Sequence, residues 1–192
     1  MGRELEKKFR ADDRVIAAIE EKYGEFTPIS METTYYDTTD MKLAMHHWTL
    51  RRRMENGVSV CTFKTPLADG SRGEWEVECG NILTGVLKLY EAGAPAELVR
   101  CTAGGLIPTC GAKFTRLAKL LEYPDFTAEL ALDRGVLMGR NKELPFAEVE
   151  VEYKTGSEEA ALAFAAALAE EFSLESEPKS KFLRAMTLTM GM

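Results

Sequence analysis

Charged side chains alternate with other residues near both ends of this sequence. Glu4, Glu6 and Lys8 stand two residues apart at the start, and the range 148–152 repeats the spacing with glutamates. Residues two apart in a β-strand share one face, so the charges of each stretch would project together. Carboxylate oxygens are the ligands that hard divalent cations such as Mg²⁺ and Mn²⁺ prefer.

A second group of regularly placed charges is basic. Arg51 and Arg53 stand two apart, Lys64 and Arg116 lie in two later stretches, and Arg72 precedes alternating glutamates. Arg binds phosphate oxygens in bidentate fashion. A solvated sheet face usually mixes signs, whereas here acidic and basic residues are segregated onto different strands. Because a buried charge needs a partner, inward-facing charges of both signs would suit a metal–phosphate complex.

These residues must be positioned mainly by strands. Asn56-Gly57 predicts a hairpin turn, and the alternating or β-branched stretches predict an antiparallel α+β fold with about eight strands. Closure into an eight-stranded β-barrel with helices packed outside would be natural for this number. The predicted strands are 1–10, 29–39, 48–54, 58–65, 72–79, 106–123, 126–134 and 146–154, with a short strand or turn at 41–47. The predicted helices are 12–24, a helical insertion at 81–104, and C-terminal helices within 157–190.

Composition narrows the possible partners. The 192 residues suit one domain, 1–192, and the hydrophobic share of 45% is enough for a core. A net charge of −7 argues against nucleic acid as a partner. We expect no membrane segment, because no apolar run approaches the roughly 20 residues that a spanning helix needs. No secretory signal is recognisable, so we expect a soluble cytoplasmic protein, either monomer or homodimer.

Cysteine and histidine give no metal signature. Cys61, Cys79, Cys101 and Cys110 form no C-x-x-C pair, and we expect reduced, buried or half-buried thiols. The adjacent pair His46-His47 would face opposite sides of a strand, which favours surface or packing roles.

The charged stretches resemble, in order and over nearly the whole chain, the motifs of the CYTH-domain proteins, one group of triphosphate tunnel metalloenzymes. The short E-x-E-x-K signature is present as Glu4, Glu6 and Lys8. A lone match would be weak, but the ordered set is specific. The other matching motifs are Tyr36-Asp37-Thr38, Leu50-Arg51-Arg52-Arg53, Thr62-Phe63-Lys64-Thr65-Pro66, Arg72-Gly73-Glu74-Trp75-Glu76, Asp133-Arg134-Gly135, Glu148-Val149-Glu150-Val151-Glu152 and Ser180-Lys181-Phe182.

The resemblance implies an eight-stranded antiparallel tunnel with a charged interior and divalent-metal-dependent activity on a triphosphate. The simplest reaction is hydrolysis of inorganic tripolyphosphate to pyrophosphate and phosphate. By analogy the ligands of Mg²⁺ or Mn²⁺ are Glu4, Glu6, Glu148, Glu150 and Glu152. The implied substrate-binding residues are Lys8, Arg51, Arg53, Lys64, Arg72, Arg116 and Lys181. The implied catalytic residues are Glu4, Glu6, Lys8, Glu148, Glu150 and Lys181.

Some individual roles stay open. Arg72 suits either the phosphate shell or an ion pair with a neighbouring glutamate. Glu74 and Glu76 would organise the basic side chains, order water or supply counter-charge. Asp133-Arg134-Gly135 reads as a turn device, and Tyr35 as a packing residue.

Other functions are compatible with the same resemblance. The family also includes thiamine-triphosphatases and class IV adenylate cyclases. The cyclases carry a His-Phe element before E-x-E-x-K, and only Met1-Gly2-Arg3 precede Glu4 here, which disfavours a cyclase. A non-catalytic polyphosphate or nucleotide sensor is a further alternative, as is a structural barrel with an ion-paired interior.

Overall fold

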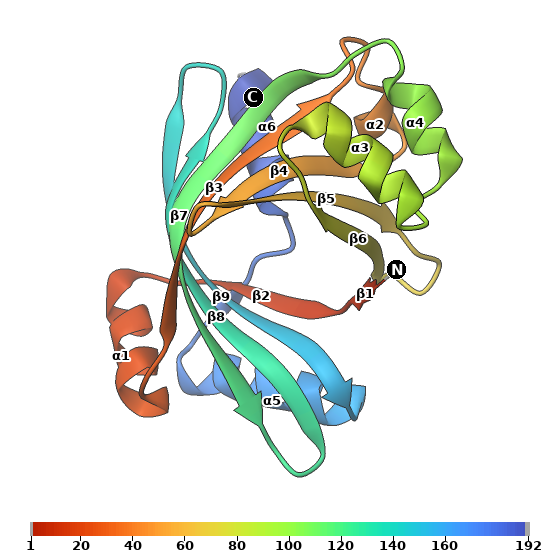
Figure 1. Cartoon of the computed structure of the whole chain (residues 1–192). Coiled ribbons are helices and arrows are strands. Elements are labelled where there is room, and N and C mark those ends of the chain that lie inside the picture. Colours follow the sequence, from red (N-terminus) through yellow and green to blue (C-terminus); the bar gives the residue numbers. More distant parts are fainter. Residues whose placement is uncertain (1, 191–192) are drawn as a thin grey trace.

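Ten antiparallel strands form one strongly curved sheet in the computed structural model, which describes residues 2–190 (Figure 1). The strand order is β1-β6-β5-β4-β3-β7-β8-β9-β2-β10. The strands are β1 (Gly2–Glu4), β2 (Glu6–Arg10), β3 (Thr27–Asp37), β4 (Thr49–Glu55), β5 (Val58–Pro66), β6 (Arg72–Glu78), β7 (Ile107–Glu122), β8 (Phe126–Met138), β9 (Glu143–Gly156) and β10 (Glu175–Ser176). The helices are α1 (Asp13–Tyr23), α2 (Lys42–Met45), α3 (Ile82–Glu91), α4 (Ala96–Thr102), α5 (Glu158–Glu171) and α6 (Lys181–Met190).

The N-terminal segment joins the two margins of the sheet. β1 pairs with β6, the chain passes Leu5, and β2 then pairs with β9. The N–H of Tyr153 donates to the carbonyl of Leu5 at 2.9 Å. The predicted closed, eight-stranded barrel is therefore wrong in detail. The sheet has ten strands and its order is not closed. The predicted strand 1–10 is divided into β1 and β2, which pair with different strands, and β10 adds an edge.

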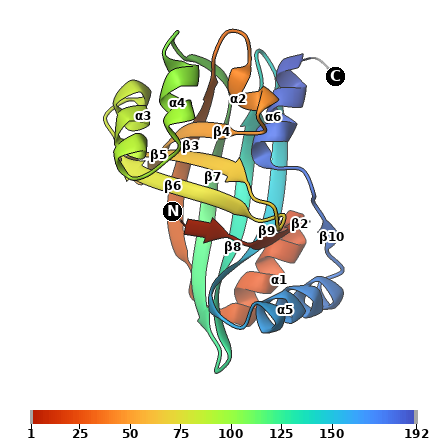
Figure 2. The ribbon, with the colours of Figure 1, turned by 90° about the vertical axis from the view of Figure 1, so that its right-hand side faces the viewer.

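Two hydrophobic layers cover the outer face of the sheet (Figures 1 and 2). Helices α1 and α5 pack on β2, β8 and β9, where Phe9, Val149 and Val151 are buried. Helices α2, α3 and α4 pack on the opposite wall, over Phe63 and Trp75. Residues that alternate with these buried ones must point inward, so helix packing outside aims the charged residues at the interior.

Helix α6 differs from the others because it packs against the inner face. Its residues Ala185 and Met186 share a core cluster with Met31 of β3, Phe114 of β7 and Phe146 of β9. Met31 and Phe114 are register partners, so α6 rests on the inside of the same strands that carry charges further along. The first turn of α6 therefore lies next to the charged interior.

Most predicted elements are confirmed, including both helices within 81–104 and the helix that Ser157 caps. Residues 41–47 are not a strand but contain α2, because the Asp37 carboxylate accepts hydrogen bonds from the N–H groups of Leu43 and Ala44. No helix in the described part of the chain has the length and apolarity needed to cross a membrane. The cytoplasmic location stays a prediction.

Two of the cysteines contradict the prediction of reduced thiols. Cys61 of β5 and Cys79, just after β6, form a disulfide with Cα atoms 6.0 Å apart. Register explains the pairing, since Val60 lies opposite Glu78 and Cys61 opposite Val77 on adjacent antiparallel strands. Cys101 and Cys110 are free thiols.

The segment Asp133-Arg134-Gly135 does not form a turn, because β8 continues through it to Met138. Gly135 lies opposite Phe114 in the ladder. A Cβ at Gly135 would lie 2.5 Å from the Cα of Phe114 and would also meet the carbonyl of Lys113. The glycine thus permits close approach of β7 and β8 where Asp133 faces the interior.

We predict that Gly135→Ala lowers the free energy of unfolding by about 1–3 kcal/mol, because the added methyl meets backbone atoms that cannot yield. Denaturant unfolding measures this. Gly104→Ala is the matched control, since nothing lies within 4 Å of a Cβ there. Its effect should stay within about 0.5 kcal/mol. Equal effects at the two positions would contradict the close-approach account.

Candidate functional site

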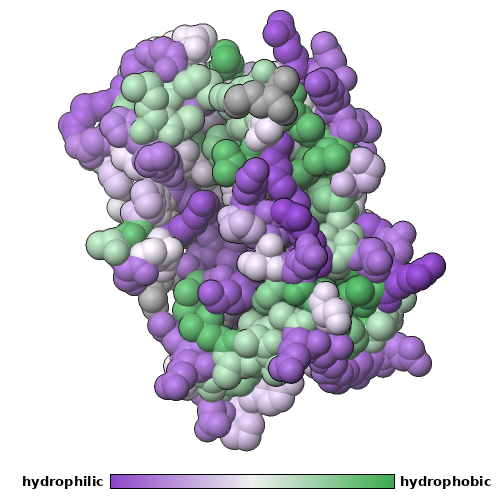
Figure 3. All heavy atoms as spheres, turned by 180° about the vertical axis from the view of Figure 1, so that it is seen from behind, coloured by the Kyte–Doolittle hydropathy of each residue, from purple (hydrophilic) through white to green (hydrophobic). Residues whose placement is uncertain are grey.

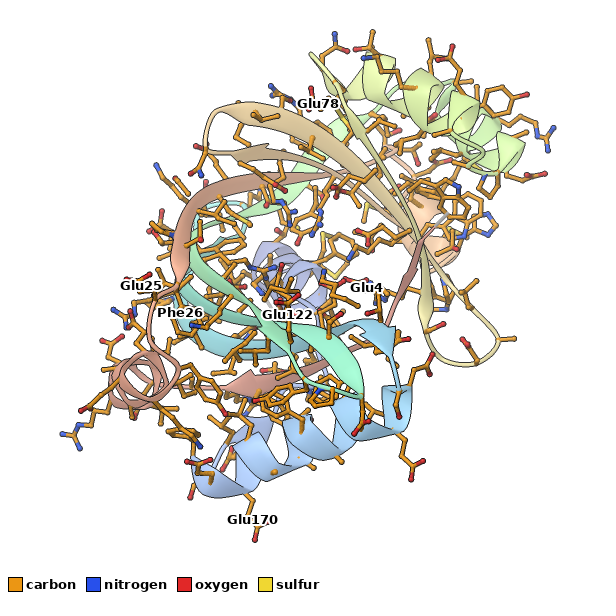
Figure 4. The ribbon with its side chains drawn as sticks, turned by 60° about the horizontal axis from the view of Figure 1, so that its bottom comes forward. Glu4, Glu25, Phe26, Glu78, Glu122 and Glu170 are labelled. Carbon is orange, nitrogen blue, oxygen red and sulfur yellow. A yellow bond between two sulfur atoms is a disulfide. The ribbon has the colours of Figure 1, made fainter. Side chains whose placement is uncertain are left out.

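A polar cavity of about 710 Å³ lies inside the curved sheet. The surface in Figure 3 is hollowed between two apolar regions, and hydrophilic side chains gather in the hollow. In Figure 4, Glu4 lies between the two halves of the sheet, whereas Glu170 of α5 points away from the molecule. The predicted site residues that line the cavity are Glu4, Glu6, Lys8, Arg51, Arg53, Lys64, Arg72, Arg116, Glu150, Glu152 and Lys181.

Strand pairing places the N-terminal charges beside the late acidic strand. Glu6 lies opposite Glu152, and Lys8 lies opposite Glu150. The next strand continues the row, since Glu129 is the register partner of Glu152. Neighbouring residues on one face of an antiparallel pair are close enough to interact directly. The sheet therefore brings together acidic residues that are well over 100 positions apart in the sequence.

Glu148 is the one predicted site residue that does not line the cavity. It shares the inner face of β9 with Glu150 but is fully buried, in contact with Lys181 and Arg184 of α6, and it forms an acidic triad with Asp133 and Glu150. One carboxylate oxygen from each residue lies within 4.8 Å of the others. We call Asp133, Glu148 and Glu150 the triad.

Three cations compensate the triad in this structure. The Lys181 ammonium lies 2.8 Å from Asp133, 2.6 Å from Glu148 and 2.7 Å from Glu150. Arg116 and Arg184 supply the other positive charges. Arg116 donates to both oxygens of Asp133 at 2.8 and 2.7 Å and to Glu150 at 2.5 Å, and Arg184 pairs with Glu148. Buried charges of this kind are tolerated only when paired.

These contacts shift the pKa values of Glu150 and Lys181. Burial alone would raise the pKa of Glu150, but Lys181 and Arg116 outweigh it and hold that pKa well below its ordinary value. Burial likewise opposes the charged form of Lys181, yet Asp133 and Glu150 raise its pKa. Glu150 is therefore ionised over the usual working range of pH.

A second acidic group lies nearer the open part of the cavity. Lys64 contacts Glu4 at 2.5 Å and Glu74 at 3.2 Å. Burial would raise the pKa of Glu4, but Lys64 and then Arg51 lower it. Thus Glu74 supplies counter-charge to Lys64, which is one of the three roles predicted for it.

Glu6 and Glu152 are less well compensated than the triad. Burial raises the pKa of Glu6, and the negative charge of Glu150 raises it further. Burial also raises the pKa of Glu152, where Lys154 opposes the shift but Glu129 adds to it. Carboxylates whose pKa values are raised by burial and by neighbouring negative charges would be stabilised in their ionised form by an added cation.

The basic wall is formed by β4 and β7. Burial lowers the pKa of Arg53, and repulsion from Arg51 and Arg116 lowers it further while Glu55 opposes the shift. The Nε atom of Arg51 is buried without a hydrogen-bond partner. Arg116 is paired with two carboxylates of the triad, whereas Arg51 reaches Glu74 only at 3.9 Å and Arg53 has Glu55 as its partner. The repulsion at Arg53 and the unbonded Nε of Arg51 favour an anionic ligand beside these two side chains.

Within residues 2–190, Arg72 and His46 make few contacts that bear on the site. Arg72 is exposed at the start of β6 and lines the cavity, and no ion pair to it occurs among the described residues. His46 stacks on Trp48 with ring centroids 4.9 Å apart, consistent with packing.

Glu129, which lines the cavity, was not predicted as a site residue, and two residues of the triad and its counter-charges were also missed from the sequence. Asp133 was assigned to a turn, although its spacing from Glu129 and Ala131 already placed it on one face of a continuing strand. Arg184 follows Lys181 by three residues, and that spacing puts both on one face of a helix. The helix was predicted, but its packing against the inner face was not.

The donor set of the triad fits a hard divalent cation. Mg²⁺ and Mn²⁺ prefer carboxylate oxygens, and three such groups converge here. An ammonium already lies among them, so the position accepts positive charge. Glu4, Glu6 and Glu152 could hold a second ion, because the last two have raised pKa values that a cation would relieve.

Comparison with known proteins gives relatives at low identity. The inorganic triphosphatase of Haemophilus influenzae is 26% identical over 166 residues, which are 82% of this chain and 47% of that protein. The chain thus spans about half the length of this curated relative.

Several solved structures share the fold. The PH1819 protein of Pyrococcus horikoshii OT3 is 21% identical with a TM-score of 0.68, covering 96% of this chain and 99% of that one. A putative adenylate cyclase of Bacillus halodurans is 21% identical with a TM-score of 0.64, covering 94% and 96%. The putative adenylyl cyclase HpAC1 of Hippeastrum, described as having a dominant triphosphatase activity, is 17% identical with a TM-score of 0.64, covering 98% and 95%.

A sequence model of the CYTH domain matches residues 2–186, nearly the whole chain. This match and the curved antiparallel sheet with its charged interior agree with the ordered motifs of the sequence. The chain belongs to the CYTH domain family.

Proposed function

We propose that this chain is a divalent-metal-dependent hydrolase whose substrate is inorganic tripolyphosphate. Residues 1–192 would form one triphosphate tunnel domain. The observation that carries the proposal is the crowding of Arg51 and Arg53 in the cavity, where burial and then Arg51 and Arg116 lower the pKa of Arg53 and the buried Nε of Arg51 has no hydrogen-bond partner. A polyanion with several phosphate oxygens would contact both of these guanidinium groups at once.

The relatives support this choice of reaction. The curated relative is named for inorganic triphosphatase activity, and one structure of similar fold is described by a dominant triphosphatase activity. Both proteins have low sequence identity to this chain, so the choice of substrate is argued from the residues of the cavity. The intact set of acidic and basic cavity residues favours turnover over mere binding.

In the proposed enzyme Asp133, Glu148 and Glu150 would hold a divalent ion such as Mg²⁺ or Mn²⁺. Such an ion neutralises charge on the phosphoryl group and the leaving phosphate. Glu150 suits this role because its pKa is held well below the ordinary value by Lys181 and Arg116, which outweigh its burial. It is therefore a carboxylate throughout the neutral range.

The basic side chains bind and orient the phosphate chain. Arg51, Arg53, Lys64 and Lys8 come from strands on different sides of the cavity, so they would contact the chain from several directions. Fixed cations aimed at the transferred group stabilise the charge that develops as water attacks phosphorus. Glu6 and Glu152, whose pKa values are raised, could accept a proton from that water.

A triphosphate carrying an organic group is the second candidate. The cavity wall also includes Met31, Tyr35, Phe114 and Phe182, an apolar region beside α6. This surface would accommodate a ring system such as thiamine or a nucleoside.

The substrate prediction is tested by incubating the chain with tripolyphosphate, ATP or thiamine triphosphate, each with Mg²⁺, Mn²⁺ or EDTA. We expect metal-dependent release of phosphate, fastest from tripolyphosphate. Faster release from an organic triphosphate would support the second candidate. Cyclic AMP with pyrophosphate, or tight binding without turnover, would overturn the proposed hydrolase.

We predict that Glu148→Gln lowers the turnover number by at least about 100-fold, because the triad loses one negative ligand. The readout is the steady-state rate of phosphate release at saturating metal. Glu171→Gln is the control, since Glu171 forms an exposed ion pair with Lys22 and lies on α5 outside the cavity. Full activity in Glu148→Gln would refute the metal assignment.

We predict a pH dependence of stability from Glu150. Its pKa in the folded chain lies well below the ordinary value, since Lys181 and Arg116 outweigh burial. Its contribution is therefore present above the unfolded pKa of about 4.3 and is lost as the pH falls through the lower folded value. In EDTA, denaturant unfolding should show a steep acid-side loss that is shallower in Glu150→Gln. The same slope in both proteins would contradict the assignment.

A further inference from the structure

Lys181 occupies the place in the triad where a bound cation would lie. Its ammonium contacts all three carboxylates within 2.8 Å, and their oxygens lie within 4.8 Å of one another. Phe114 and Phe146 flank the same ammonium, with ring centroids 5.3 and 5.4 Å away. A divalent ion held by all three carboxylates would need this space, so the two cations exclude each other.

The other cations of the triad are less able to leave. Arg116 is fixed by a two-pronged contact with Asp133 and by Glu150. Arg184 is shared between Glu148 and Glu177, so it bridges two buried carboxylates. Each guanidinium makes its contacts through a rigid planar fork, whereas Lys181 makes all three of its contacts through one compact ammonium on a flexible stem.

The Lys181 side chain borders open space into which its ammonium could move. It lines the cavity as well as contacting the triad. Its backbone is fixed at the start of α6, where the N–H of Leu183 donates to Ser180 Oγ at 3.1 Å. Its four-carbon stem is flexible and ends in a compact charge. The ammonium can therefore swing into the cavity while the helix stays in place.

We propose that Lys181 is a resident counter-ion of the triad, released into the cavity when a divalent cation binds there. This inference rests on the metal dependence proposed above. In this structure three cationic side chains offset three carboxylates. Exchange of Lys181 for a divalent ion adds two positive charges to the region, since the ammonium stays nearby. Metal binding would thereby prepare the cavity for a polyanion, and metal would bind before the phosphate chain.

Calorimetric titration with Mn²⁺ in the absence of substrate tests the exchange. Lys181→Met removes the competing charge but keeps an unbranched side chain. We expect it to bind Mn²⁺ at least tenfold more tightly than the wild type, a change of about 1.4 kcal/mol. Lys22→Met, which removes a lysine from an exposed ion pair, should bind as the wild type does. Equal or weaker binding by Lys181→Met would overturn the inference.

Labelling of the wild-type chain gives a second test that does not depend on folding of the variant. The Lys181 side chain is 10% exposed when its ammonium contacts the triad. Acetylation with an amine-specific reagent, followed by mass spectrometry, should modify Lys181 several-fold faster when Mn²⁺ is present. Lys22, 44% exposed, serves as the internal reference and should not change. An unchanged or slower rate at Lys181 under saturating Mn²⁺ would refute its release.

Neither test uses a substrate, so their outcome is separate from that of the proposed hydrolase. Release of Lys181 by Mn²⁺ without hydrolysis of any triphosphate would support this inference and overturn the proposed reaction. Metal-dependent hydrolysis with Lys181 unresponsive to Mn²⁺ would support the proposed reaction and overturn this inference.

Discussion

Compensation of buried charge is the constraint on which this structure depends. Asp133 and Glu148 are fully buried and Glu150 nearly so, and isolated carboxylates could not remain ionised there. Lys181 and Arg184 supply opposite charges from α6, and Arg116 does so from β7, the strand next to that of Asp133. The placement of α6 inside the sheet follows from this, because its first turns deliver two of the three cations.

The outer helices make the charged interior possible. α1 and α5 cover one outer wall, and α2, α3 and α4 cover the other, so both walls bury their apolar residues outside (Figure 1). Alternation then leaves the remaining residues of each strand to face the cavity. This reverses the usual arrangement of a small barrel, in which the interior holds the hydrophobic core. The part of the interior beside α6 keeps an apolar filling.

Much of this arrangement could be predicted from the sequence, because period-two alternation is a local property. Glu4, Glu6 and Lys8 were assigned to one face from spacing alone, and they line the cavity. The parts that were missed depend on contacts across the fold. The division of the first strand at Leu5 depends on which strands flank it, and the disulfide depends on the register of β5 and β6. Asp133 was missed because glycine two residues later suggested a turn, whereas the glycine allows β7 to approach.

The central claim is that the cavity holds a divalent metal on the triad and a triphosphate on the basic wall. A crystal structure with Mn²⁺ and the non-hydrolysable imidotriphosphate tests it most directly, with anomalous scattering to locate the metal. The account predicts an anomalous peak at about 2.0–2.3 Å from oxygens of Asp133, Glu148 and Glu150. It also predicts phosphate oxygens in contact with Arg51 and Arg53. A metal away from the triad, or a cavity without the phosphate chain, would contradict it.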